Sequence, residues 1–140
     1  MKKKWKRNLL LVCLTVILVG LIGSGAALLY TEKERREARN VEIDQVNFNK
    51  LHAGEYTGEY AGGMYKWRAN KVLVTVTAHK VTAIQLLEHA ENQPAASADE
   101  LFGRVIQAQS LQVDSISGAT LTSKAYLKAI ENALHKSVEM

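Results

Sequence analysis

Residues 9 to 30 contain no charged side chain, and this run constrains the fold more than any other feature of the chain. Its 22 residues would form a helix about 33 Å long, enough to cross the hydrocarbon core of a bilayer. The residues before it carry no acid and five basic side chains, Lys2, Lys3, Lys4, Lys6 and Arg7. Basic residues favour the cytoplasmic side and attract anionic lipid. We therefore expect a single-pass cell-membrane protein with a cytoplasmic N-terminus and an extracytoplasmic domain.

A cleaved signal peptide is the alternative interpretation of this segment. Ser24, Gly25 and Ala26 resemble a small-residue cleavage site that follows an apolar stretch. The apolar run continues without interruption through residues 27 to 30, which favours an uncleaved anchor. Under either interpretation, residues 31 to 140 are exported.

The positive net charge belongs to the membrane tail. Five of the 18 Lys and Arg residues precede the apolar run, which leaves 13 against all 14 Asp and Glu residues in the exported part. Nucleic-acid binding therefore has no electrostatic basis. The exported part also contains no cysteine, so a hydrophobic core without disulfides must stabilise it.

Composition divides the chain into four segments. Residues 1–8 form a basic cytoplasmic tail and residues 9–30 the transmembrane helix. Residues 31–49 form a charged stalk and a lead-in, with Glu32 and Arg36 at the i, i+4 spacing of a solvated helix that holds the domain off the membrane. Residues 50–138 form one small domain.

The first half of this domain has the pattern of β-strands. The stretches YTGEYAGGMYKWRA (residues 56–69), KVLVTVTA (71–78) and KVTAIQLLEH (80–89) are rich in aromatic or β-branched residues. They predict three strands in an antiparallel meander. The break at Ala78-His79 lacks the Asn-Gly or Asp-Gly of a tight hairpin, so the turn type stays open.

The second half has the pattern of helices. A polar connection that contains Pro94 leads to a capping box of Ser97 and Glu100, which predicts a helix over residues 98–109 with Leu101, Val105 and Ile106 on one face. The pattern of residues 124–136 predicts a second helix, which begins near Thr122 and whose apolar face consists of Tyr126, Ile130, Ala133 and Leu134. The expected fold is a small α+β domain in which two helices pack on an antiparallel sheet.

A hydroxyl-rich segment, VDSISGATLTSKAY (residues 113–126), precedes the second helix. A purely structural explanation gives Gly118 a positive φ or a close backbone approach, and uses Thr122 or Ser123 as the helix N-cap. A functional explanation uses the helix N-terminus to hold a phosphate. No base adjacent in sequence activates Thr120, so a phosphoester on its hydroxyl would have to be installed by another protein.

The same segment resembles the flavinylation motif of the FMN-binding domain family, which occurs in subunits of sodium-pumping NADH:quinone reductase and Rnf-type complexes. The family pattern is an acid, two residues, Ser or Thr, and then Gly-Ala-Thr. Here it is met by Asp114, Ser117, Gly118, Ala119 and Thr120. Similarity extends over residues 50 to 136, with a departure at Ala78-His79, where family members often carry Asp-Gly.

The resemblance implies specific chemistry. Thr120 would carry FMN through a phosphoester, transferred from FAD by a Mg-dependent flavin transferase. Asp114 and Ser117 would belong to the recognised motif, while Gly118 and Ala119 would leave the approach to Thr120 open. Leu121 and Thr122 complete the expected cofactor-binding stretch. No residue is expected to be catalytic.

The remaining candidate residues carry weaker signals. The four histidines have no ligand spacing, so no metal site is expected. Four aromatic residues are candidates either for stacking on a flavin or for packing in the core: Tyr60, Tyr65, Trp67 and Tyr126.

Together these features predict an FMN electron carrier that exchanges electrons with a membrane donor and an extracytoplasmic acceptor. A non-covalent FMN-dependent reductase and an anchored non-redox binding module are the alternatives.

Overall fold

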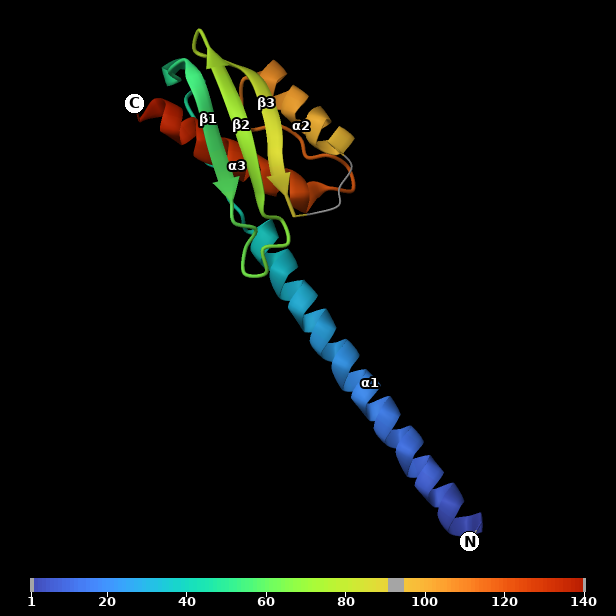
Figure 1. Cartoon of the computed structure of the whole chain (residues 1–140). Coiled ribbons are helices and arrows are strands. Elements are labelled where there is room, and N and C mark those ends of the chain that lie inside the picture. Colours follow the sequence, from blue (N-terminus) through green and yellow to red (C-terminus); the bar gives the residue numbers. More distant parts are fainter. Residues whose placement is uncertain (1, 91–94, 140) are drawn as a thin grey trace. The chain divides into compact units, whose positions relative to one another are not determined.

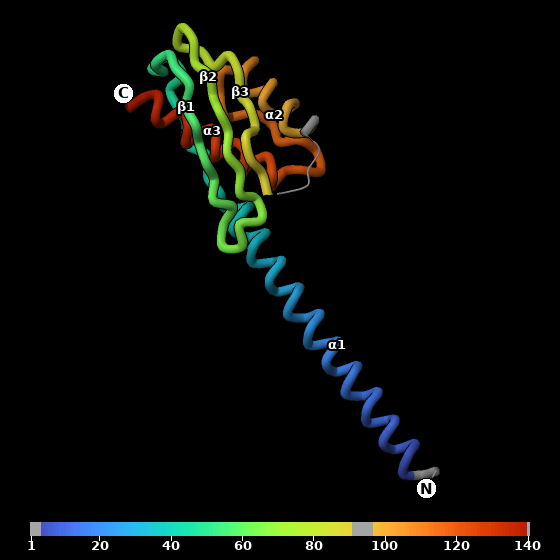
Figure 2. The backbone as a smooth tube through the Cα atoms, in the orientation of Figure 1, coloured from blue at the N-terminus to red at the C-terminus, as the bar shows by residue number. Residues whose placement is uncertain are grey.

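A computed structural model describes residues 2–90 and 95–139 of the chain (Figures 1 and 2). Its elements are, in order, α1 (Lys2–Arg39), the short 3-10 helix η1 (Phe48–Lys50), β1 (Gly54–Tyr60), β2 (Asn70–Thr77), β3 (Lys80–His89), α2 (Ala95–Ala108) and α3 (Thr120–Val138). The chain divides into two compact units, Met1–Arg35 and Arg36–Met140. Each unit is described by itself.

The first unit is helical throughout its described residues and carries the apolar run. Helix Lys4–Arg39 is long and apolar enough to cross a membrane, and no residue in its most apolar stretch is buried. Its exposed side chains include Leu11, Ile17 and Leu28. Length and composition therefore agree with the expected span, while a signal sequence has the same properties.

The second unit contains a three-stranded antiparallel sheet in the order β1-β2-β3. Side chains alternate along β2, so that Val72, Val74 and Val76 are buried on one face. The predicted meander is confirmed. The first strand ends at Tyr60, however, so the prediction that the β pattern extends to residue 69 is wrong. Residues 61–69 form a loop, which begins with positive φ at Gly62 (82°) and Gly63 (73°).

The β2–β3 turn has an uncommon composition. Ala78 and His79 both have positive φ, 50° and 61°, as a two-residue type I′ hairpin turn requires. Neither residue is favoured there, because a Cβ atom is strained in this region. His79 Nδ1 lies 2.7 Å from the Leu51 carbonyl oxygen, and this contact ties the turn to the rest of the domain.

Both long helices of the domain lie on the same face of the sheet (Figure 1). Helix α3 packs against β1 and β2, and α2 packs against β3. Their apolar faces join the inward valines in a single core, with Leu101, Val105, Ile130 and Leu134 fully buried. The predicted α+β fold and the predicted apolar faces are confirmed.

Three local expectations are wrong. Helix α2 begins at Ala95, so Ser97 is inside the helix and cannot be its N-cap. The connection expected before it, including Pro94, falls largely on residues 91–94, outside the described residues. Helix α3 begins at Thr120, before the expected start near Thr122. The last turn of the charged segment 31–40 is not solvated throughout, because Ala38 is buried and packs as part of the domain.

Candidate functional site

The motif forms a turn that leads directly into α3. The Ala119 N–H donates to the Ile116 carbonyl oxygen at 3.0 Å, which closes the turn, and Gly118 has a φ of 77°. The expected positive φ at Gly118 is therefore confirmed. Glycine adopts such a φ without strain, because it has no Cβ to clash. Thr120 follows as the first residue of α3 and is exposed.

The helix start is not capped by a hydroxyl. Its N-cap residue is Ala119, which makes no side-chain capping bond, so the expected cap by Thr122 or Ser123 is wrong. The physical reason is that α3 starts before both residues, which places them in its first turn. Ser123 Oγ instead accepts from the buried Ile116 N–H at 3.1 Å, and this bond holds the start of the turn against the helix.

The structure separates the predicted site residues by exposure. Asp114, Ser117, Gly118 and Thr120 are exposed, Ala119 and Leu121 are half-buried, and Thr122 is buried. Ser123 is only 2% exposed. The five hydroxyls of the motif therefore do not share one environment, and Thr120 combines an exposed side chain with a position at the helix N-terminus.

Arg104 of α2 holds the segment before the turn. Its Nη1 donates to the carbonyl oxygens of Asp114 at 2.7 Å and Ser115 at 3.3 Å, while Nη2 pairs with Glu100 at 2.7 Å. Because Arg104 binds the backbone, the Asp114 carboxylate is not consumed by this contact. Arg104 is not among the site residues predicted from the sequence. Only its i, i+4 spacing from Glu100 was visible in the sequence.

Helix α3 also holds the lead-in segment, residues 39–44. Lys124, one turn after Thr120, donates to the carbonyl oxygens of Arg39 at 2.7 Å and Val41 at 3.4 Å. Lys128 donates to the Glu42 carbonyl oxygen at 3.1 Å. A groove of about 840 Å³ lies between this segment and residues 111–115, so it reaches the acidic end of the motif.

Asp44, Glu131 and His135 place possible metal-ligand atoms within 4.8 Å of one another. The Glu131 carboxylate is only 2% exposed and already has three partners. It accepts from the Asp44 N–H at 3.0 Å and from Lys128 at 2.7 Å, and His135 Nε2 lies 3.4 Å away. The Lys128 ammonium supplies the positive charge that a metal would bring. We assign no metal to this cluster.

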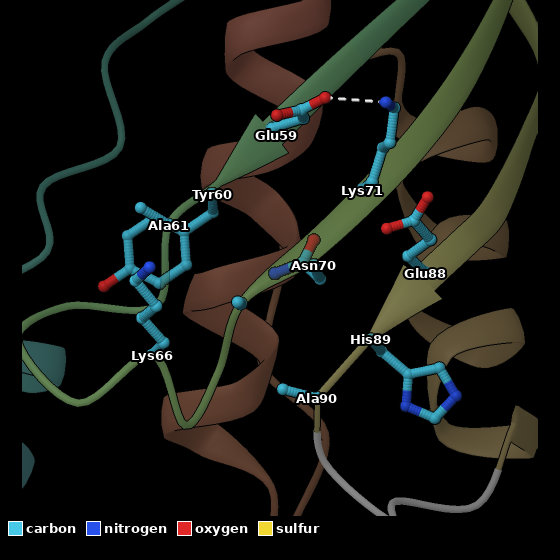
Figure 3. A pocket seen from close by; sticks show the side chains of 10 residues that line it. Glu59, Tyr60, Ala61, Lys66, Asn70, Lys71, Glu88, His89 and Ala90 are labelled. Atoms are coloured by element: carbon cyan, nitrogen blue, oxygen red, sulfur yellow. Dashed lines mark ion pairs between the residues drawn. The ribbon is translucent and has the colours of Figure 1, made fainter.

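A second hollow of about 570 Å³ lies where β1 and β3 end and β2 begins (Figure 3). Lys71 and Glu59 pair across it at 2.7 Å. The hydrogen bond and charge of Lys71 lower the pKa of Glu59, and Glu59 raises the pKa of Lys71 for the same reasons. Within the described residues, the buried Asn70 Oδ1 has no hydrogen-bond partner.

The four aromatic candidates also lie in different environments. Tyr126 is buried and packs edge-on against Phe102, with ring centroids 5.8 Å apart, so it belongs to the core. Tyr60 is half-buried and lines the second hollow. Tyr65 and Trp67 contact each other in the 61–69 loop, with centroids 5.3 Å apart. We assign none of the four to a flavin ring.

Three comparisons place these features among known proteins. The family model described as FMN-binding domain matches residues 66–135, half of the chain. An uncharacterized protein of Treponema pallidum (strain Nichols) is 32% identical over 65 residues, which cover 45% of this chain and 18% of that protein. The chain thus spans less than a fifth of this relative. The crystal structure of the CPE2226 protein from Clostridium perfringens has a similar fold, with a TM-score of 0.51 and 24% identity over 64% of this chain and 90% of that chain.

Proposed function

This chain belongs to the FMN-binding domain family, and on that premise we propose that it is a membrane-anchored, extracytoplasmic electron carrier. Its FMN is joined covalently to Thr120 through a phosphoester. The observation that carries the proposal is the position of Thr120, which is exposed at the N-terminus of α3 directly after the Gly118 turn.

The residues around Thr120 fit a phosphate-linked group. A Cβ added to Gly118 would meet nothing within 4 Å, so the space beside the turn is open. The first turn of α3 contains no acidic residue, and its N-terminus has no side-chain cap. Free N–H groups and the positive end of a helix dipole both favour an anion at this place.

The chemistry of attachment requires a second protein. Thr120 Oγ would attack the phosphorus on the FMN side of FAD, forming an O–P bond while the pyrophosphate P–O bond breaks. AMP leaves, and the hydroxyl proton passes to a base. Among the described residues, no side chain hydrogen-bonds to the Thr120 hydroxyl, and an ordinary threonine is a weak nucleophile. A Mg-dependent flavin transferase would supply the base and recognise the exposed Asp114 and Ser117.

The bound flavin would accept and release one or two electrons, while the protein anchors and positions it. Electrons would pass from a membrane donor to an extracytoplasmic acceptor. The apolar run of α1 supports anchorage, and the basic residues before it support a cytoplasmic N-terminus. Either a retained anchor or a cleaved signal peptide would export the domain.

The test is co-expression of the full chain with a flavin transferase in cells that make FAD, followed by denaturing electrophoresis and in-gel flavin fluorescence. We expect a fluorescent band for the wild type and for Thr122→Ala, and none for Thr120→Ala. Asp114→Ala should weaken the band without loss of folded protein. A wild-type chain that stays unlabelled with an active transferase would refute covalent attachment.

The same experiment separates the alternatives. Flavin that copurifies with the native chain but is lost on denaturation would indicate non-covalent binding, as in a reductase. A chain that carries no flavin in either state would indicate a non-redox module.

A further inference from the structure

The loop between β1 and β2, residues 61–69, exposes large apolar side chains. Met64 is 54% exposed and Trp67 is 44% exposed. The Tyr65 ring contacts the Trp67 ring, and the Lys66 side chain between them is exposed. An apolar and aromatic cluster next to a cationic side chain is typical of protein surfaces that meet a bilayer interface.

The loop has a defined conformation. The Lys66 N–H donates to the Gly63 carbonyl oxygen and the Ala69 N–H to the Lys66 carbonyl oxygen, both at 3.2 Å. A Cβ on Gly62 would lie 2.3 Å from the Ala69 nitrogen, so only glycine allows the two ends of the loop to approach this closely. The exposure of Met64 and Trp67 is therefore built into the loop and is not the result of fraying.

Within the second unit, Glu37 contacts this loop. Its Oε2 accepts from the Met64 N–H at 3.2 Å. Glu37 follows Tyr30, the last residue of the apolar run, by seven positions. Seven residues span about 10 Å as a helix and at most about 25 Å when extended. The headgroup region is itself roughly 5–8 Å deep on each side of the hydrocarbon core. With the apolar run in a bilayer, chain length alone therefore keeps Glu37, and the loop bonded to it, near the membrane surface.

We propose that residues Met64–Arg68 dock on the outer surface of the bilayer, with the Trp67 and Met64 side chains in the headgroup region. This inference rests on the membrane anchorage of the proposed function. Trp and Tyr prefer this region because one end of each ring is apolar and the other is polar. The exposed Lys66 side chain would meet anionic lipid headgroups. Docking would hold the domain in one orientation, where an anchor alone would let it rotate.

The chain offers a direct test because it has only two tryptophans, Trp5 and Trp67. Trp5→Phe leaves Trp67 as the sole tryptophan reporter, and Trp67→Phe leaves Trp5. Each full-length variant is reconstituted into three kinds of phosphatidylcholine–phosphatidylglycerol vesicle. The first has unmodified acyl chains, the second carries bromine on the acyl chains near the headgroup, and the third carries bromine near the end of the acyl chains. Bromine quenches tryptophan that it contacts, so the loss of emission reports both insertion and depth.

We expect Trp67 emission to shift to shorter wavelength in vesicles and to be quenched more by the shallow bromines than by the deep ones. Adding Met64→Ser to the Trp67 reporter should reduce both the shift and the quenching. Quenching of Trp5 in the matched variant tests the anchor separately. If the bromines quench Trp5 but leave Trp67 unaffected, the proposed docking is overturned and the membrane anchor is supported. Loss of both signals would overturn the anchor and the docking together. Trp67 that is shielded but insensitive to bromine would mean that protein covers the loop, which also overturns the proposal.

Discussion

Helix α3 lies so close to β1 that only glycine fits at position 58, and this contact gives a quantitative prediction. A Cβ on Gly58 would lie 1.9 Å from the Ala129 carbonyl oxygen, 2.5 Å from the Ala133 nitrogen and 2.9 Å from the Ala133 Cβ. Optimal separations between non-bonded heavy atoms are about 3.5–4.0 Å. Gly58→Ala therefore forces the helix that carries Thr120 away from the sheet by roughly 1.5 Å.

The cost of this shift follows from the packing. Overpacking of a core costs typically about 1–3 kcal/mol, and here the obstructing atoms are backbone, which cannot rotate away. We therefore expect a loss of about 3 kcal/mol or more in the free energy of unfolding. For a domain of this size that corresponds to a decrease of roughly 10–25 °C in Tm.

The assay is thermal unfolding of the full chain in detergent, followed by near-ultraviolet circular dichroism of the aromatic side chains. Gly103→Ala in α2 is the matched control, because a Cβ there meets nothing within 4 Å. That change should raise stability by about 0.5–1 kcal/mol, since glycine weakens a helix interior. A Gly58→Ala variant that melts with the wild type would refute the close packing of α3 on β1.

Three further changes test other contacts. Ser123→Ala removes the acceptor of the buried Ile116 N–H and should cost about 1–3 kcal/mol in chemical denaturation, with wild-type stability as the contradicting result. Glu131→Gln removes the charge of a buried carboxylate that has three polar partners, and it should lower the free energy of unfolding by about 2–3 kcal/mol in the same assay. Lys71→Met should raise the pKa of Glu59 towards its ordinary value in an NMR titration. In the wild type, the Glu59–Lys71 attraction is present at neutral pH and fades as the pH falls through the lowered pKa of Glu59. It also weakens in salt, because the Glu59 side chain is exposed and that of Lys71 is only half-buried.

The main elements of the domain were predictable because their signals are local. Alternating Val72, Val74 and Val76 indicate a strand with one buried face, and the structure buries all three. The face of α3 was predictable for the same reason, since Tyr126 and Ile130 recur with the period of a helix. The family was also identifiable, because the motif is continuous in the sequence.

The errors arose where distant contacts override local rules. Ser123 has the side chain of a helix cap, but Ile116 binds it from the preceding turn, so the helix begins earlier. Arg104 joins α2 to the backbone of Asp114, a contact that no sequence pattern shows. The alternation in residues 61–69 resembles a strand, although close backbone contact at Gly62 folds that segment into a loop.

The most direct test of the central claim is to locate the flavin on the chain by mass spectrometry. Trypsin cleaves after Arg104 and Lys124, and no basic residue lies between them, so the whole motif leaves as a single peptide. We predict that this peptide from the co-expressed chain is heavier by one FMN less water, and that fragmentation places the added mass on Thr120. An unmodified peptide, or added mass on Ser117 or Thr122, would contradict the account.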